Sequence, residues 1–282
     1  MEKLICPAKL EKLLVCTDGS PDSEGAITSA LALAQACNSK IYLLQVVEEM
    51  SLDPEQAAWP GIREKREKEA LDHLEAWRAE TTKVNIDLET RMVPSEAPYV
   101  GIVEEAKTIQ PDLIIMGRHG GSRLYRVFMG NVTARVISHS PFNVLVVRKD
   151  CPLNFKKIMV ASDGSPHSYA AWDEAMQLAK RMGSQLTAVS VASNGLTKET
   201  AKKVIDKLAM EAEREGITVE TAVLQGRPYA AIIQASQERG ADLVIMGALG
   251  LSGFTSFLLG SVTERVIAGA PCSVLVVKEG FK

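Results

Sequence analysis

The chain has few aromatic residues, few cysteines and no long apolar segment. Only 5% of its 282 residues are aromatic, and its five cysteines are an odd number without any C-x-x-C pair. No apolar run approaches the roughly 18–20 residues that span a membrane, and residues 1–7 lack the apolar core of an export signal. Five free thiols in a reducing cytoplasm are the simplest interpretation. We expect a cytoplasmic protein without membrane contact.

Positive charge is also not in excess. The chain has 32 Lys and Arg residues against 35 Asp and Glu, a net charge of −3, whereas nucleic-acid-binding domains carry a basic face. The four histidines share no spacing between the two halves and have no cysteine partner, so zinc is not expected. We expect no nucleic acid partner and no metal other than Mg2+ accompanying a nucleotide.

One sequence pattern is present twice. KLLVCTDGSP at 12–21 recurs as KIMVASDGSP at 157–166, and DLIIMG at 112–117 recurs as DLVIMG at 242–247. Each copy has the length of a domain and is far longer than a stacking repeat. The two pairs differ in offset by 15 residues, so the first copy contains an insertion in its middle.

Strand-like and helix-like stretches alternate along both copies. Each apolar run is followed by a helical stretch, and Ser20-Pro21 has the residues of a helix start. The expected strands cover 12–17, 41–47, 84–88, 113–116 and 143–147, then 158–161, 186–191, 219–224, 243–246 and 273–277. Apolar strands separated by helices indicate a parallel sheet covered on both faces. The predicted fold is α/β, doubly wound, in two tandem domains at 1–150 and 151–282.

Each copy also contains three glycines at one spacing, Gly-x2-Gly-x9-Gly, followed by Asn or Ser, a pattern that we call the glycine frame. Its residues are Gly117, Gly120, Gly130 and Asn131 in the first copy, and Gly247, Gly250, Gly260 and Ser261 in the second. A lone G-x-x-G would be weak evidence, but this frame occurs twice, each time after an apolar run and before a helix. Backbone N–H groups at such a place bind phosphate, with Asn131 or Ser261 as helix cap.

Other residues should meet this loop, because ligands of doubly wound sheets bind at the carboxyl ends of the strands. Asp18 and Asp163 follow the first strand of each copy, and Val46 and Val191 end the second strand, where backbone groups can bind an adenine edge. A purely structural interpretation stays open: the glycines can serve a tight turn, and the aspartates can cap the Gly-Ser turn that follows them.

These residues resemble the universal stress protein family, in its tandem, ATP-binding form. The resemblance covers nearly the whole chain, up to the closing VLVV of each copy, and implies a five-stranded sheet per domain. It implies that the last strands pair within the chain, that a further homodimer forms, and that ATP binds with or without Mg2+ held by Asp18 or Asp163. The implied site residues are Asp18, Val46, Met116, Gly117, Gly120, Gly130, Asn131, Val132, Asp163, Val191, Met246, Gly247, Gly250, Gly260, Ser261 and Val262.

The two loops differ in charge. The first contains Arg118, His119, Arg123 and Arg126, which could neutralise a triphosphate, but it has Asn131 where the family usually has Ser or Thr. The second loop, 248–259, has no basic residue and would need backbone amides, a metal ion or Arg227. We expect both copies to bind an adenine nucleotide with different affinities.

Catalytic groups are not evident. Neither loop has a Walker lysine, a second carboxylate or a duplicated histidine nearby, as phosphoryl transfer would require. The leading hypothesis is a nucleotide-responsive binding module of the stress response. A slow ATPase, or a scaffold for another small ligand in which one domain has lost nucleotide, remains open. The charged stretch 63–78 is interpreted as an exposed helix and as a candidate lid or partner surface.

Overall fold

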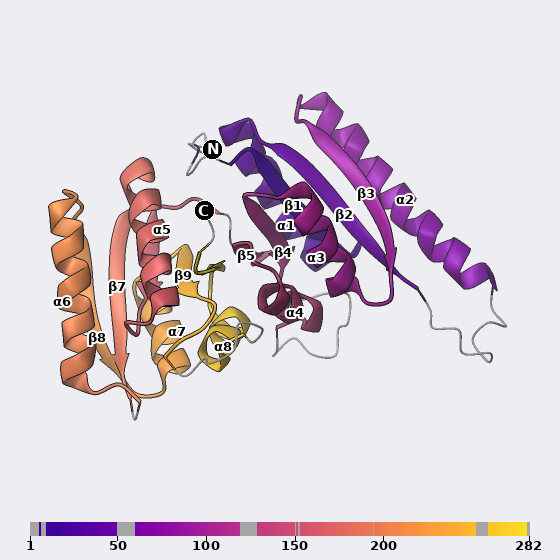
Figure 1. Ribbon diagram of the computed structural model, residues 1–282. Coiled ribbons are helices and arrows are strands. Elements are labelled where there is room, and N and C mark those ends of the chain that lie inside the picture. Colours follow the sequence, from indigo (N-terminus) through magenta and orange to yellow (C-terminus); the bar gives the residue numbers. More distant parts are fainter. Residues whose placement is uncertain are drawn as a thin grey trace.

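The computed structural model describes residues 6, 10–49, 60–118, 129–149, 151, 153–193, 195–251 and 259–280. Both halves repeat one order of elements (Figure 1). The first half contains β1 (Lys12–Thr17), α1 (Pro21–Cys37), β2 (Lys40–Glu48), α2 (Pro60–Lys83), β3 (Leu88–Ser95), α3 (Pro98–Ile109), β4 (Leu113–Gly117), α4 (Asn131–His139) and β5 (Val144–Val147). The second contains β6 (Lys157–Ala161), α5 (Pro166–Met182), β7 (Gln185–Ala192), α6 (Lys198–Arg214), β8 (Val219–Gln225), α7 (Pro228–Glu238), β9 (Leu243–Gly247), α8 (Ser261–Gly269) and β10 (Ser273–Val277).

All ten strands belong to one sheet, in the order β3-β2-β1-β4-β5-β10-β9-β6-β7-β8. Within each half every pairing is parallel, as in β1 with β4 and β6 with β9. Only the central pair, β5 with β10, is antiparallel. The expected α/β class and the pairing of the last strands within the chain are confirmed.

Helices cover both faces of this sheet, and each face has its own apolar core. One core lies under α1, α2, α5 and α6 and includes the fully buried Trp172. The other lies under α3, α4, α7 and α8. Each core contains residues of both halves, so the apolar layers continue across the central strand pair.

Local sequence explains where the helices begin and end. Ser20 and Ser165 are the N-caps of α1 and α5, each accepting a hydrogen bond from the backbone N–H three residues later and each followed by proline. Helix α1 ends at Asn38 and α5 at Gly183, both in the left-handed conformation that terminates helices.

The expected strand at 84–88 is misplaced. The third strand is β3, Leu88–Ser95, and residues 84–87 form a turn in which Asn85 has φ 55°. Ile86 packs against the core from this turn while Val84 is exposed, so their alternation is not that of a strand. β3 is an edge strand and pairs only with β2. Edge strands tolerate charged residues, and those of β3 obscured the strand pattern in the sequence.

The expectation of five free thiols is wrong, because Cys6 and Cys37 form a disulfide with their Cα atoms 4.6 Å apart. The bond joins the N-terminal segment to the end of α1, a proximity that cysteine counting does not show. Cys16, Cys151 and Cys272 are free thiols. Burial raises the pKa of the Cys272 thiol to about 12.

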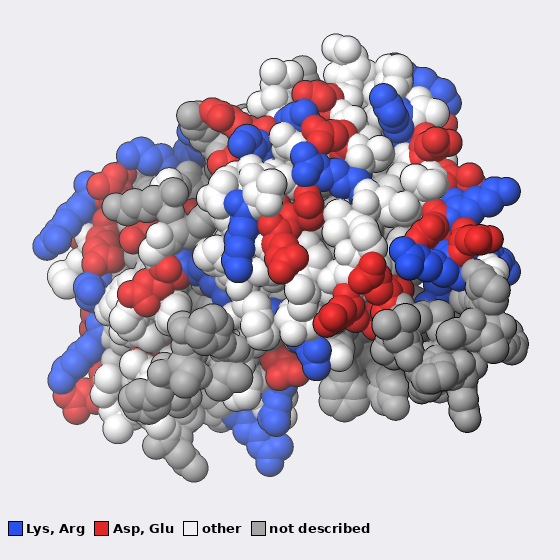
Figure 2. All heavy atoms as spheres, turned by 45° about the vertical axis from the view of Figure 1, so that its right-hand side comes forward, with Lys and Arg blue, Asp and Glu red and all other residues white. Residues whose placement is uncertain are grey.

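Charges of both signs are distributed over the face in Figure 2, where Lys and Arg alternate with Asp and Glu among the described residues. Helix α2 contributes such charges as ion pairs: Arg63 pairs with Glu67 and Lys65 with Glu69 at i,i+4 spacing, as expected for an exposed helix. Its 24 residues, against 17 in α6, hold part of the insertion. None of the described helices combines the length and apolarity needed to cross a bilayer.

Cations cross the central strand pair in both directions. Arg118, at the end of β4, donates to the carbonyl oxygens of Ala270 and Cys272 at 2.7 and 3.1 Å, next to the end of α8. In the other direction the Lys278 ammonium donates to the carbonyl of Ile137 in α4. Cations at helix C-termini are favourable because the last carbonyls lack helical partners.

We predict a pH-dependent stability that comes from Lys278. Burial lowers the pKa of this lysine to about 8, from an ordinary value of 10.5. Between these values the folded chain binds fewer protons than the unfolded chain, so the free energy of unfolding rises with pH by about 3 kcal/mol.

Chemical denaturation across this pH range measures the effect, and the Lys278→Met variant should show a flatter profile than wild type. Lys83→Met, which removes an exposed lysine at the end of α2, is the control. Parallel profiles for wild type and Lys278→Met would contradict the assignment.

Candidate functional site

A cavity of about 390 Å³ lies at the carboxyl ends of the strands in the second half. It brings together every site residue expected in that half, namely Asp163, Val191, Met246, Gly247, Gly250, Gly260, Ser261 and Val262. These residues come from the ends of β6, β7 and β9 and from the start of α8. The volume lies within the range of small-molecule sites.

Asp163 holds two loops of this cavity in place. Its Oδ1 accepts from the backbone N–H of Ser165 at 3.0 Å, and its Oδ2 accepts from that of Leu251 at 2.8 Å. Gly164 follows with φ 83°, in the left-handed region that favours glycine. The structural interpretation of this aspartate is therefore observed: it caps the Gly-Ser turn and fastens the glycine loop to the first strand.

Close approach, and not a positive φ, explains the glycines of the second frame. A Cβ on Gly247 would lie 2.8 Å from the carbonyl oxygen of His167, and one on Gly250 would lie 2.6 Å from Oδ2 of Asp163. At Gly260 it would lie 3.3 Å from the carbonyl oxygen of Ala248. The first glycine lets α5 pack on β9, and the second leaves room for the aspartate.

One wall of the cavity is apolar. Val191, Ile232 and Met246 are each less than one-tenth exposed and line it together with Val189 and Leu196. An aromatic ring fits such a wall, and the end of β7 supplies backbone groups beside it.

Other lining residues were not predicted from the sequence. They are Ala161, Ser162, Ser168, Val189, Ser193, Gly195, Leu196, Pro228, Ile232, Leu249, Leu251 and Thr263. Some were detectable, because Leu249 and Leu251 flank Gly250 and Ile232 lies one helical turn after Pro228. Thr263 donates to the carbonyl oxygen of Gly247 at 3.0 Å and so ties α8 to the end of β9.

The capping role expected for Asn131 and Ser261 is wrong. Gly130 and Gly260 are the N-cap residues of α4 and α8, and neither cap has a side-chain hydrogen bond. Asn131 and Ser261 are the first helical residues, so the N–H groups of the first turns are available from the backbone alone.

The first half places its predicted residues less compactly. Asp18 and Val46 line a cavity of about 350 Å³, whose other walls include Arg66, Glu69 and His73 of the inserted helix α2. Val132 and Met116 pack in the core under α3 and α4. The Thr133 hydroxyl donates to the Gly117 carbonyl at 3.1 Å, as Thr263 does in the second half. Gly120 lies outside the described residues.

The Arg118 side chain is bonded across the junction between the two halves. Its side chain is 9% exposed and turns toward the second half, where it donates to three backbone carbonyls, those of Ala268, Ala270 and Cys272. Burial, and then the charge of Arg148, lowers its pKa to about 10. The other basic residues of this loop, at 119, 123 and 126, lie outside the described residues.

Positive charge in the second half lies away from the glycine loop. Asp163 is the one charged residue of the described cavity lining. An adjoining hollow of about 750 Å³ shares Ser193, Gly195, Leu196 and Pro228 with the cavity and adds Lys198 and Arg227. Lys198, at the start of α6, and Arg227, just before α7, therefore border the site from this hollow.

This architecture, with a ligand-sized cavity at the strand ends and a glycine loop before a helix, is that of nucleotide-binding α/β domains. The model of the universal stress protein family matches residues 9–148 and 154–278. The chain belongs to this family and contains it twice.

Individual relatives agree with this assignment. A universal stress protein of Mycolicibacterium smegmatis is 26% identical over 94% of this chain and 96% of its own length. One from Methanocaldococcus jannaschii is 34% identical over 45% of this chain and 85% of its own length. The crystal structure of a universal stress protein from Archaeoglobus fulgidus has a TM-score of 0.76 at 23% identity and covers 95% of this chain and 98% of its own, a likeness that shows the fold.

We predict that Gly247→Ala destabilises the protein. The added methyl group meets the backbone of His167, which cannot move without shifting α5, at a cost of about 1–3 kcal/mol. Gly61→Ala is the control, since a Cβ at that exposed position in α2 meets nothing within 4 Å. Urea unfolding of both variants measures the difference, and equal midpoints would refute the packing argument.

Proposed function

We propose that this protein is a nucleotide-responsive module that binds an adenine nucleotide, ATP in particular, in the second-half cavity and in an equivalent site of the first half. One observation supports this most strongly: a single cavity collects all eight residues that the sequence assigned to the second site. Family membership supports the same chemistry.

The proposed pose follows from the apolar wall of the cavity and from the start of α8. The adenine packs on Val191 and Met246, and its polar edge bonds to backbone groups at the end of β7. The phosphates lie at the start of α8, beside Ser261 and Val262, where first-turn N–H groups and the helix dipole favour negative charge.

Binding is favoured over rapid hydrolysis. Both oxygens of Asp163 accept backbone N–H bonds, so this carboxylate has an evident structural role and its position is fixed by the loops that it joins. Among the described residues no cluster of three or more His, Cys, Asp or Glu side chains is positioned for a metal ion. Mg2+, where it accompanies ATP, would depend mainly on phosphate oxygens.

The two sites are proposed to differ in affinity. The second lacks a basic residue in its loop, and Lys198 and Arg227 lie at its far end. In the first, α2 adds Arg66, Glu69 and His73 beside Asp18. Because these charges surround different parts of the ligand, the polyphosphate experiences a different field in each half.

We predict two binding events of unequal affinity in a calorimetric titration with ATP. Ser261→Glu places a negative charge at the start of α8 and should weaken the second-half event by about tenfold or more, a loss of about 1.4 kcal/mol. The substituted residue is exposed, and an acidic residue suits a helix N-terminus, so folding is expected to persist.

Asn131→Glu is the matched variant, because Asn131 holds the same first position in α4. It should weaken the other event and leave the second-half event unchanged. Two identical sites, or heats that neither variant alters, would overturn the proposal. ADP release followed over time in the same samples distinguishes a binding module from a slow ATPase.

A further inference from the structure

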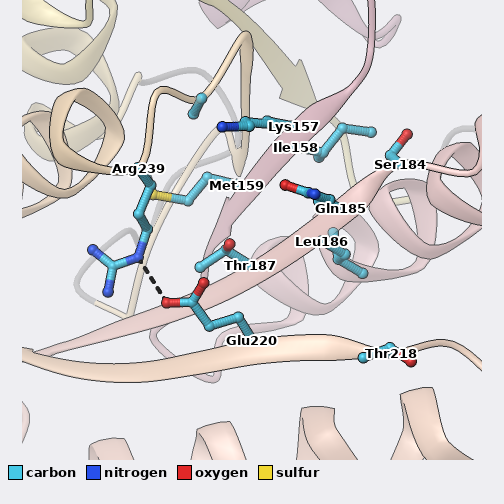
Figure 3. A pocket seen from close by; sticks show the side chains of 11 residues that line it. Lys157, Ile158, Met159, Ser184, Gln185, Leu186, Thr187, Thr218, Glu220 and Arg239 are labelled. Atoms are coloured by element: carbon cyan, nitrogen blue, oxygen red, sulfur yellow. Dashed lines mark hydrogen bonds and ion pairs between the residues drawn. The ribbon is translucent and has the colours of Figure 1, made fainter.

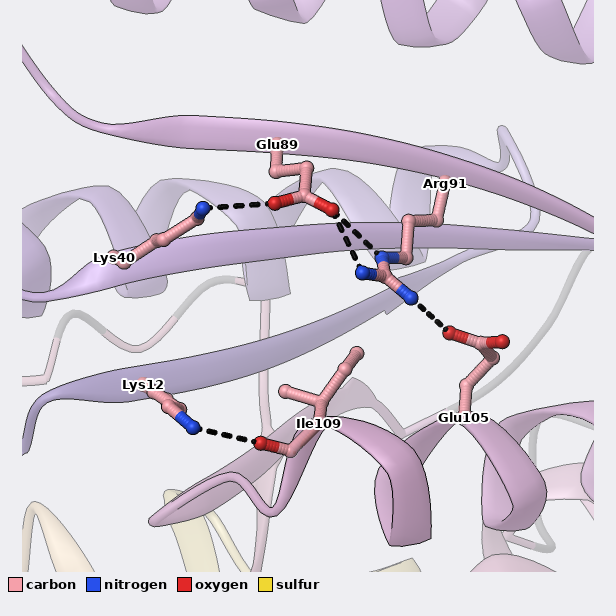
Figure 4. Close-up of polar contacts among 6 residues, drawn as sticks. All are labelled: Lys12, Lys40, Glu89, Arg91, Glu105 and Ile109. Carbon is pink, nitrogen blue, oxygen red and sulfur yellow. Dashed lines mark hydrogen bonds and ion pairs between the residues drawn. The ribbon is translucent and has the colours of Figure 1, made fainter.

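The two halves differ at the amino ends of their strands, far from the nucleotide loops. In the first half Glu89 pairs with Lys40 and with Arg91, both at 2.8 Å (Figure 4), and both cations lie over the Tyr42 ring. The second half has Thr187 in place of this tyrosine, and an open cavity of about 470 Å³ results (Figure 3). Most of its polar side chains are exposed, so the cavity by itself does not define a site. The segment that joins the two halves runs along this same end of the sheet.

This joining segment begins beside β10. The antiparallel register of β5 with β10, continued by two residues, places Arg148 opposite Cys272. The Arg148 N–H donates to Oγ of Ser273 at 3.3 Å. A turn follows, in which the N–H of Cys151 donates to the carbonyl oxygen of Arg148 at 3.1 Å. The turn keeps Cys151 at the start of β10.

The other end of the joining segment is fastened to the start of β9. Oδ2 of Asp242 accepts from the backbone N–H groups of Lys156 and Lys157, at 2.9 and 2.8 Å. Asp112 makes the equivalent pair of bonds at the start of β1 in the first half. Because both ends of the segment are held, the position of Cys151 is fixed by the fold.

Two free thiols meet at this place. Cys151 and Cys272 both pack in the core under α3, α4, α7 and α8. The backbone N–H of Ser273, the residue after Cys272, donates to the Cys151 thiol. Cys272 is 1% exposed, whereas Cys151 is only half-buried. The two thiols are therefore neighbours, with Cys151 open to solvent and Cys272 beneath the surface.

Two cations lie beside the thiols. Arg118 donates to the carbonyl oxygen of Cys272, and Arg148 donates to that of Ala270, both at 3.1 Å. The Arg118 side chain is buried, and its Nε has no hydrogen-bond partner among the described residues. A buried donor without an acceptor costs free energy, and a thiolate or sulfenate beside it supplies compensating negative charge.

The surroundings distinguish the two thiols. Burial raises the pKa of the Cys151 thiol, and the charge of Asp242 adds to this, but the Ser273 N–H and the two arginines oppose it. Burial raises the pKa of the more deeply buried Cys272 thiol to about 12. Cys151 is therefore the thiol that ionises more readily and that a solute reaches first.

The duplication supports a redox role for this position. Cys6 and Cys151 are each followed by proline, and they precede the first strand of their copies by the same distance. Cys6 is bonded to Cys37, the last residue of α1, but α5 ends in Met182. Cys151 thus lacks the partner that its counterpart has, and the fold places Cys272 beside it instead.

We propose that hydrogen peroxide converts Cys151 and Cys272 into a reversible disulfide, which fastens the joining segment to β10. The Cys151 thiolate attacks one peroxide oxygen, so an S–O bond forms, the O–O bond breaks and hydroxide leaves. The Cys272 sulfur then attacks the sulfenic sulfur, so the S–S bond forms, the S–O bond breaks and water leaves. In total two thiols lose two electrons and two protons, and one peroxide becomes two waters. A dithiol reductant reverses the reaction by thiol–disulfide exchange.

Peptide mapping of the full chain under non-reducing conditions, after treatment with hydrogen peroxide, tests the proposal. Mass spectrometry should detect a cross-linked pair of peptides that contain Cys151 and Cys272, and dithiothreitol should separate them. The Cys6–Cys37 pair is the internal standard for detection. Cys16, a buried free thiol at the end of β1, is the control and should be oxidised at least tenfold less than Cys151.

Two variants test the order of the steps. Cys272→Ala should stop the reaction at the Cys151 sulfenic acid, which dimedone captures. Cys151→Ser should give no cross-link and should leave Cys272 unoxidised, because peroxide reaches the buried thiol only through Cys151. If Cys272→Ala fails to fold, Cys151→Ser decides alone, since it changes a half-buried residue. Absence of the cross-link in wild type, or equal oxidation of Cys272 in Cys151→Ser, overturns the proposal.

Discussion

The antiparallel pairing of β5 with β10 is the contact on which the rest of the molecule depends. It turns two five-stranded sheets into one sheet of ten strands and makes the apolar layers of both faces continuous. Reciprocal bonds reinforce it: the Lys278 N–H donates to Asn143 at 2.9 Å, and the Arg148 N–H donates to Ser273 at 3.3 Å. Edge strands that would otherwise be exposed are thereby paired.

This junction also changes what the first glycine loop can do. Arg118 begins that loop, yet its charge is used to hold the end of α8 in the other half. A cation bonded to several carbonyls is not available to a nucleotide. The two copies therefore differ where they meet, and they also differ at the opposite end of the sheet, where one copy is filled by Tyr42 and the other is open.

Much of the lining of the second-half cavity was predictable because its residues belong to short motifs that end strands. Asp163, Val191 and Gly247 each follow or close an apolar run, and parallel strands bring such ends together whatever the intervening sequence. The first half was less predictable, since Arg66, Glu69 and His73 come from an inserted helix whose charges look like an ordinary solvated face. Nothing local marks which of those side chains faces Asp18.

The sequence by itself determined the duplication, the α/β class, the helix boundaries at Ser20 and Ser165, and the repeated glycine frame, because each depends on periodicity or on residues close together in the chain. Only the tertiary structure decided the Cys6–Cys37 disulfide, the inward turn of Arg118 and the open cavity beside Thr187. These depend on which surfaces meet after folding. A side chain's partner in space is set by the packing of distant elements, and that information is not in its neighbours along the chain.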